Sequence, residues 1–321
     1  MLVIGKLELE SPVVMAPIAG FSDVAFRHIL RRFTNSLMFA EMVSATALVV
    51  GAKGSLRRLE AKSNHSPLGV QLLGANPAHF YEAARYVEDQ GYDLVDINLG
   101  CPKVPGEQLA GAKLMGYPEL VARLIRAMRK AVDIPVTVKM RAGLEEGRIN
   151  CVQIARIAQE EGADGITVHG RTCAQRFSGR CNLDWIAQVV EAVDIPVIAN
   201  GDIQTPQQAK MVLAKTKASG VMIGRAALGK PWLLAQVERY LLDGEFFPDP
   251  SFEEIRQILL DHLDYIQRFL GDIYLRKNMR KVVSTYFKSV PHVRRLRQRV
   301  HQISDYFRLR EELLSFSLEP V

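Results

Sequence analysis

The 321-residue sequence has few cysteines and no long apolar run. Its four cysteines form no C-x-x-C pair, and Cys173 and Cys181 have no matching His or Cys pair nearby, which argues for reduced thiols and against a metal site. No apolar stretch approaches the ~20 residues of a membrane span, and the first residues lack the layout of a signal peptide. We therefore expect a cytoplasmic protein with no metal, no membrane contact and no obligate protein partner.

The sequence also lacks a Gly-x-Gly-x-x-Gly motif after its first predicted strand, which argues against a Rossmann dinucleotide site. Short runs rich in Val and Ile recur instead, separated by segments of helical period such as 77–89, 119–131 and 206–214. The runs lie at 13–16, 37–40, 69–72, 94–97, 136–139, 165–168, 197–200 and 221–224. Eight β/α units predict an α/β fold of the (β/α)8 TIM-barrel class.

The pattern changes towards the carboxyl terminus. We expect a barrel domain over 1–243, a linker over 244–250 and a small all-helical domain over 251–321. Residues 276–299 contain nine Lys and Arg and no acid, and Tyr286 and Phe287 lie among these cations. With a net charge of +6 and a pI of about 9.1, this composition favours a surface that binds a phosphate backbone.

The stretch 95–102 has the pattern of a strand that ends in a tight turn at Gly100 and Pro102. Asn98 and Cys101 then lie at the carboxyl end of a barrel strand, where barrel enzymes carry their chemistry. From position alone, Cys101 is either a reactive acid or nucleophile or a small buried apolar residue.

Polar side chains follow most of the other predicted strands, and their convergence on one rim favours a ligand site. Asn200-Gly201-Asp202 and Gly224-Arg225 end the last two strands, where glycine backbone and the positive end of a following short helix suit a phosphate. Lys139 suits the N1–C2 edge of a flavin, and Gln71 suits its N3–C4 edge. Taken singly, Lys139 equally fits a Schiff-base aldolase.

Together these residues resemble the tRNA-dihydrouridine synthases, and they look closest to the bacterial B-type branch. The matching segments are 15–23, 41–42, 70–74, 96–102, 109–112, 138–141, 169–172, 198–202 and 222–226, with 277–281 in the helical tail. They follow one another through nearly the whole barrel, so the resemblance is specific.

The resemblance implies that NADPH reduces a bound flavin mononucleotide (FMN), which passes a hydride to C6 of a uridine in tRNA. It implies that Cys101 donates a proton to C5, a role that suits a thiol because an ordinary thiol is protonated near neutral pH. The implied FMN contacts are Ala16, Pro17, Gln71, Lys139, His169, Asn200, Gly201, Asp202, Gly224 and Arg225. The implied substrate contacts are Asn98, Arg141 and Arg171 at a flipped uracil, and Lys277, Arg280 and Lys281 on the tRNA.

Two positions depart from the family pattern. Lys103 and Val104 follow Pro102 directly, so the loop after Cys101 is one residue short, and Val282 stands where the family often has His. Three other functions stay open: a flavin barrel that acts on a free pyrimidine, like the dihydroorotate dehydrogenases, a tRNA-binding module without catalysis, and a sugar-phosphate barrel enzyme. The basic tail argues against the first and the third.

Overall fold

The computed structural model describes residues 1–60, 66–102, 109–288 and 290–317. Eight parallel strands form a barrel in the order β3-β11-β10-β9-β8-β7-β6-β4, and a parallel bridge between Val14 and Leu37 joins its two ends. This confirms the predicted TIM barrel. The strands are β3 (Val13–Met15), β4 (Met38–Phe39), β6 (Leu68–Leu73), β7 (Leu94–Leu99), β8 (Val136–Gly143), β9 (Gly165–Thr172), β10 (Val197–Asn200) and β11 (Gly220–Ile223).

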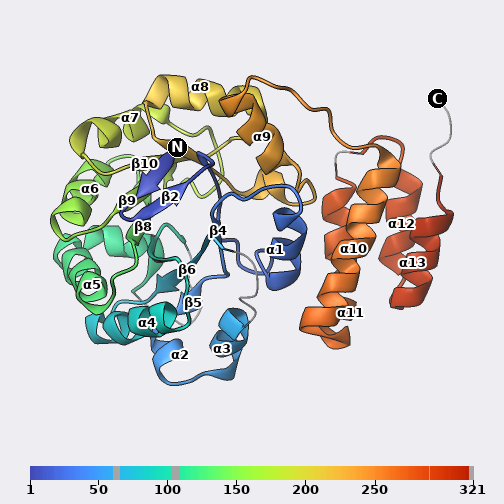
Figure 1. Ribbon diagram of the computed structural model, residues 1–321, viewed down its shortest axis with the longest axis horizontal. Helices are drawn as coiled ribbons and strands as arrows, with labels where there is room; N and C mark the ends of the chain where they lie inside the picture. Colours follow the sequence, from blue (N-terminus) through green and yellow to red (C-terminus); the bar gives the residue numbers. More distant parts are fainter. Residues whose placement is uncertain (61–65, 103–108, 289, 318–321) are drawn as a thin grey trace.

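Helices surround the barrel (Figure 1), and their ends follow local sequence signals. Asn76 caps the helix that spans 77–89, as predicted, and its side chain accepts from the Ala78 backbone N–H at 2.9 Å. The helix at 206–216 runs two residues beyond its predicted end and stops where Lys217 adopts a left-handed conformation. The helices are α1 (Val24–Arg31), α2 (Ala45–Val49), α3 (Lys53–Glu60), α4 (Pro77–Asp89), α5 (Pro118–Ala131), α6 (Cys151–Glu160), α7 (Leu183–Ala192), α8 (Pro206–Thr216) and α9 (Leu233–Leu242), with the 3₁₀ turns η1 (Gly111–Gly116) and η2 (Arg225–Ala227).

The structure adds a hairpin, β1 (Leu2–Ile4) with β2 (Leu7–Leu9), and a short strand, β5 (Val43–Ser44), paired with β6. The periodicity of the sequence did not indicate these elements, because each is only two or three residues long. The hairpin buries Leu2 and Ile4 in one cluster with inner-barrel residues such as Ile198. It therefore covers the amino ends of the strands and leaves the carboxyl ends, here called the barrel mouth, as the accessible side.

A group of four further helices lies beside the barrel, and within it α10 packs against α1 (Figure 1). The four helices are α10 (Phe252–Leu270), α11 (Asp272–Tyr286), α12 (Arg294–Gln302) and α13 (Tyr306–Ser315). Residues 244–250 contain no helix or strand. The core of the helical group includes Ala25 and Ile29 of α1 as well as Trp232, so apolar packing continues across the predicted boundary. The division into domains therefore stays a prediction. Within the described part of the chain, no helix combines the length and apolarity of a membrane span.

Candidate active site

Polar side chains from three neighbouring strands form a hydrogen-bonded network inside the barrel near its mouth. Asp96 of β7 is 1% exposed and accepts hydrogen bonds from Gln71 Nε2 and Thr137 Oγ1, both at 2.7 Å. Asn98 Nδ2 donates to Gln71 Oε1 at 2.7 Å. Burial raises the pKa of Asp96 to about 7, although its hydrogen bonds and the charge of Lys139 oppose the shift. The network fixes the amides of Gln71 and Asn98, which the resemblance predicts to contact the cofactor and the substrate.

Cys101 lies on the turn after β7, and neighbouring groups fix its backbone. Asn98 Oδ1 accepts from the backbone N–H groups of Gly100 and Cys101 at 3.0 and 2.9 Å. Arg141 Nε donates to the Gly100 carbonyl at 2.8 Å, and the Ala112 N–H donates to the Cys101 carbonyl at 2.9 Å. The turn thus holds Cys101 at the mouth, where it is partly exposed.

Lys139 of β8 lies close to this turn and contacts Asn200 of β10. Its Nζ donates to Asn200 Oδ1 at 3.1 Å, and Asn200 Nδ2 donates to the Met222 carbonyl at 2.8 Å. Burial lowers the pKa of Lys139 to about 8, and the charge of Asp96 partly offsets this effect. Lys139 is therefore still mostly protonated near neutral pH and brings a positive charge to the mouth.

His169 and Arg171 of β9 form a second bonded group with Asp202. Arg171 is 2% exposed, and its Nη2 donates to Asp202 Oδ2 at 2.6 Å. Its Nη1 lies 3.3 Å from His169 Nε2, and because a guanidinium can only donate, that ring nitrogen accepts. Burial, followed by the charges of Lys139 and three arginines, lowers the pKa of His169 to about 2, so the imidazole is neutral. The predicted substrate residue Arg171 and the predicted cofactor residue Asp202 thus bond to each other, and both assignments stay predictions.

A glycine follows each of the strands β10 and β11. There is no room for a side chain at Gly201, and Gly224 lies close to the end of another strand. Gly201 has φ +127°, and a Cβ atom on it would lie 2.6 Å from Cys181 Sγ. Gly224 lies beside Ala16, which precedes Pro17 and whose N–H donates to the Ile223 carbonyl at 2.8 Å. The implied FMN contacts at the ends of β3 and β11 are therefore close together.

The segments that follow β10 and β11 do not form the short helices that the sequence predicts at the strand ends. After β11 the chain forms only the single 3₁₀ turn η2, and after β10 the helix α8 starts at Pro206, several residues beyond Asn200. One turn carries little helix dipole, because the dipole is a sum over aligned peptides. An anion at this place would depend on backbone N–H groups and on the side chain of Arg225.

Sequence patterns did not single out two residues that the structure brings into the site. Asp96 lies two residues before Asn98 on the same strand, and this spacing puts both on one face. Phe177 lies in the loop after β9, is 51% exposed, and has the Arg225 guanidinium carbon 3.9 Å from its ring centroid. The available signal was an aromatic residue between Arg176 and Arg180 in a loop at the mouth.

The basic tail is largely a solvent-facing surface. Of its nine cations, all except the partly buried Arg297 are exposed, including the predicted tRNA contacts Lys277 and Arg280. Tyr286 and Phe287 are 1% and 0% exposed, because they pack in the core of the helical group. The expectation that these two rings interleave with the surface cations is therefore wrong: they lie on the inner side of the helices.

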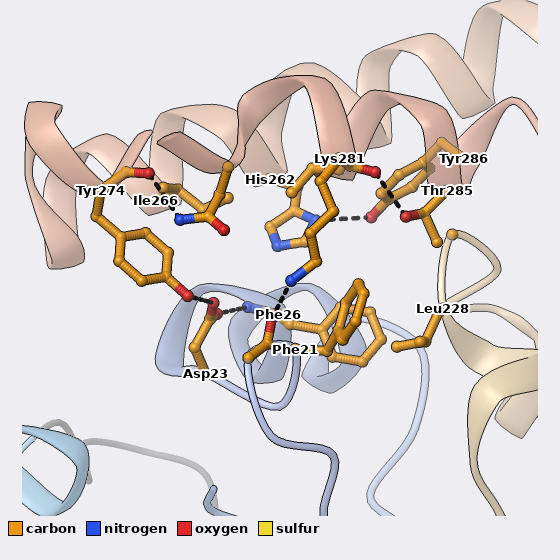
Figure 2. A pocket seen from close by; sticks show the side chains of 14 residues that line it. Phe21, Asp23, Phe26, Leu228, His262, Ile266, Tyr274, Lys281, Thr285 and Tyr286 are labelled. Carbon is orange, nitrogen blue, oxygen red and sulfur yellow. Dashed lines mark hydrogen bonds between the residues drawn. The ribbon is translucent and has the colours of Figure 1, made fainter. Parts of the chain in front are cut away.

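Lys281, the third predicted tRNA contact on α11, instead contacts the barrel (Figure 2). Its Nζ donates to the Gly20 carbonyl at 2.7 Å and lies 3.6 Å from the centroid of the Phe21 ring. Tyr274 of the same helix donates its hydroxyl to Asp23 Oδ2 at 3.2 Å. Burial raises the pKa of Asp23 to about 6. These contacts dock α11 against the loop that follows β3.

The loop after β11 forms the other side of this junction. Gly229 has φ +76°, and a Cβ atom on it would lie 2.3 Å from the Thr285 carbonyl oxygen, so the backbones of the barrel loop and α11 touch. A small pocket lies between them, lined by apolar groups such as Phe26 and Leu228. Because β3 and β11 both end at the mouth, the helical group is anchored beside the candidate active site.

Part of the predicted site falls outside the described residues. The shortened loop with Lys103 and Val104 belongs to the segment 103–108, which the structure does not describe. Among the residues that it does describe, no three His, Cys, Asp or Glu side chains gather as metal ligands.

Fold and site together define a class: a parallel β/α barrel with a cysteine and several cations at its mouth and a basic helical group docked beside them. Comparison with known proteins makes this specific. The family model described as Dihydrouridine synthase (Dus) matches residues 14–318, and the chain belongs to this family. The resemblance found in the sequence is thereby confirmed.

Individual relatives match along most of their length. The tRNA-dihydrouridine synthase B of Xanthomonas axonopodis pv. citri is 41% identical over 289 residues, which cover 90% of this chain and 87% of that protein. The probable tRNA-dihydrouridine synthase of Rickettsia bellii is 38% identical over 318 residues, with 98% of both chains covered. Among solved structures, the histamine dehydrogenase from Rhizobium sp. 4-9 superposes with a TM-score of 0.58 at 14% identity, covering 82% of this chain and 50% of that one. That likeness concerns the fold alone.

Proposed function

We propose that this protein reduces uridine in tRNA to 5,6-dihydrouridine, with FMN as cofactor and NADPH as electron donor. Family membership supports the reaction class. The observation that carries the proposal is the turn that holds Cys101 at the mouth, fixed by Asn98 and Arg141 and next to the cationic Lys139. A tRNA substrate also fits the cytoplasmic location expected from the sequence.

The residues at the mouth fit FMN. Lys139, Arg141, Arg171 and Arg225 lie close enough to His169 for their charges to lower its pKa, so four cations converge on one region that suits an anionic phosphate and ring edge. Gln71 uses one amide hydrogen and one lone pair in the network with Asp96 and Asn98, which leaves a donor and an acceptor for a flavin edge. When bound and reduced, FMN supplies the hydride that is added to C6 of the uracil.

The residues of the protein supply the proton that completes the reduction. Addition of hydride at C6 leaves a developing negative charge that a proton at C5 removes, and the Cys101 thiol is the proposed donor. Lys139 and Arg141 lie near enough to Cys101 for electrostatic interaction with it, so two cations flank the place where the proton is transferred. Asn98 fixes the turn, so the thiol is positioned before the substrate binds.

The exposed cations of the tail are the proposed tRNA surface. Lys277 and Arg280 face solvent on α11, a helix docked beside the mouth, so a bound RNA can contact both regions. A barrel that acted on a free pyrimidine would have no use for this surface. We therefore favour tRNA over a small substrate.

The test is to purify the protein, record its flavin absorbance, and incubate it with NADPH and tRNA from cells that lack this protein. We expect a yellow protein and new dihydrouridine at defined positions, mapped against tRNA from the parent cells. A colourless protein that takes up no flavin, or tRNA with an unchanged dihydrouridine content, would overturn the proposal. The same assay with NADH in place of NADPH identifies the preferred donor.

A further inference from the structure

The loop between β9 and α7 carries an aromatic ring to the barrel mouth. Phe177 is 51% exposed, so about half of the side chain stays open to solvent although Arg225 and Arg141 lie over its ring. The neighbouring Arg176 and Arg180 on the same loop are exposed as well. An exposed ring flanked by cations is the combination with which proteins bind unpaired nucleotides, through stacking on the base and attraction of the phosphates.

Two buried arginines hold this loop in place. Arg141 Nη1 donates to the carbonyl of Arg176 at 2.9 Å, while Arg171 Nε and Nη2 donate to the carbonyls of Ser178 and Gly179 at 3.0 and 2.7 Å. Both arginines are 2% exposed. The backbone on either side of Phe177 is therefore anchored to the barrel by charge-assisted hydrogen bonds, so the ring is held in position despite its exposure.

The surroundings of the ring also point to a nucleic acid. The Arg225 guanidinium carbon lies 3.9 Å from the ring centroid, and the His169 ring centroid lies 6.4 Å away. Arg225 lies against the ring and the Arg141 guanidinium carbon is 5.6 Å from its centroid, while the half of the side chain that stays exposed is available to a partner. A planar base can stack there while the surrounding arginines contact the adjoining phosphates.

We propose that Phe177 stacks on a tRNA base next to the uridine that is reduced. This inference rests on the proposed function, because it takes tRNA as the substrate. The Phe177 ring would then replace the stacking that the neighbouring base loses when the target uridine flips out of the RNA. The two buried arginines then serve as positioning residues for the loop, whatever else they contact.

The test measures the affinity of the FMN-saturated protein for unmodified tRNA, without NADPH so that no turnover occurs. Phe177→Ala is compared with Phe177→Trp, which keeps a stacking ring, and with Arg180→Gln, which removes one charge from the same loop. We expect Phe177→Ala to weaken tRNA binding roughly 5- to 150-fold, the affinity ratio that corresponds to the stacking of one base. Phe177→Trp should bind within about twofold of the wild type, because every base has a π face that either ring can cover.

Salt dependence separates stacking from charge. Stacking releases no counterions, so Phe177→Ala should keep the wild-type slope of log affinity against log salt, whereas Arg180→Gln should reduce the slope by about one. The affinity of the flavin-free protein for FMN, measured by fluorescence, should be unchanged in Phe177→Ala.

Several results would overturn the inference. Wild-type tRNA affinity in Phe177→Ala would do so, as would a loss that Phe177→Trp does not restore. A weaker FMN affinity, with tRNA binding normal once FMN saturates the protein, would mean that the ring acts only by holding Arg225. A wild-type protein that itself binds no tRNA would instead contradict the proposed function, and this inference with it.

Discussion

The cations at the barrel mouth and the cations on the helical tail are built into the molecule in opposite ways. Arg141 and Arg171 are 2% exposed and direct their N–H groups to backbone carbonyls, whereas Lys277 on the tail is exposed. A buried guanidinium must keep its donors paired, so it orders the loops around it. An exposed cation keeps its water until phosphates replace it. Burial therefore decides which cations organise the site and which are available to bind RNA.

The largest expected effect is the loss of activity when the Cys101 thiol at the mouth is removed, while tRNA binding by the tail is retained. We expect Cys101→Ala to lower the rate of dihydrouridine formation by about 10²- to 10⁴-fold, the usual contribution of a general acid. FMN absorbance and tRNA affinity should stay at wild-type values, because the tail is unaffected. Single-turnover assays with reduced protein measure the rate, and filter binding measures the affinity.

Cys173→Ala is the matched control for this experiment. Cys173 is also partly exposed and follows a barrel strand, but no role is proposed for it. It should retain wild-type activity. Full activity in Cys101→Ala would refute the acid role, while loss of activity in both variants would indicate a general effect on the loops at the mouth.

Stability should respond to a cation at the mouth but not to one on the tail. Arg171→Gln removes the ion pair with Asp202 and leaves two loop carbonyls without their donor, and we expect it to lower the free energy of unfolding by about 3 kcal/mol. Lys277→Gln should change it by less than about 0.5 kcal/mol, since exposed positions tolerate substitution. Urea denaturation measures both. Equal effects would show that burial does not distinguish the two regions.

The charge of Lys139 predicts a pH dependence that is specific to the mouth. Its pKa is lowered to about 8, so the side chain is cationic below that pH and neutral above it. The phosphate of FMN stays doubly charged throughout this range, because its second pKa is about 6. We expect the affinity of the flavin-free protein for FMN to fall by about tenfold between pH 7 and pH 9, the value of one charge-assisted hydrogen bond.

Lys139→Met is the control for the pH experiment. It should bind FMN more weakly at pH 7 and lose the tenfold decline up to pH 9, and a smaller decline that remains would then come from the ionisation of Asp96, whose pKa is about 7. A pH profile identical to that of the wild type would exclude Lys139 as its origin. The affinity of the tail for tRNA should depend on the salt concentration and should not change between pH 7 and pH 9.

The smallest expected effect is a difference between two cations of the tail, Lys277 and Lys281. Lys277→Gln should reduce the slope of log tRNA affinity against log salt by about one, as expected for a lost phosphate contact. Lys281→Gln should leave that slope almost unchanged, because its amine already contacts the Gly20 carbonyl and the Phe21 ring. It should instead lower the free energy of unfolding by about 1 kcal/mol. Equal changes of slope would mean that Lys281 leaves the junction to bind RNA.

The barrel could be predicted because its signals are local. Each buried parallel strand is a short continuous apolar run, and helix starts such as Asn76-Pro77 carry their own capping residues. The hairpin β1–β2 was missed because its strands are three residues long. Candidate residues such as Asn98, Cys101 and Lys139 could be named because the carboxyl end of a barrel strand is a known place for chemistry.

By itself the sequence determined the order of strands, the family and the polar residues at the strand ends, since these depend on neighbours along the chain. Only the tertiary structure decided which of the cations are buried. It paired Arg171 with Asp202, brought Lys281 to Gly20 across 261 positions, and set Phe177 over Arg225. The physical reason is that desolvation and hydrogen-bond pairing depend on groups distant in the sequence, and these meet only once the barrel and the helical group have packed.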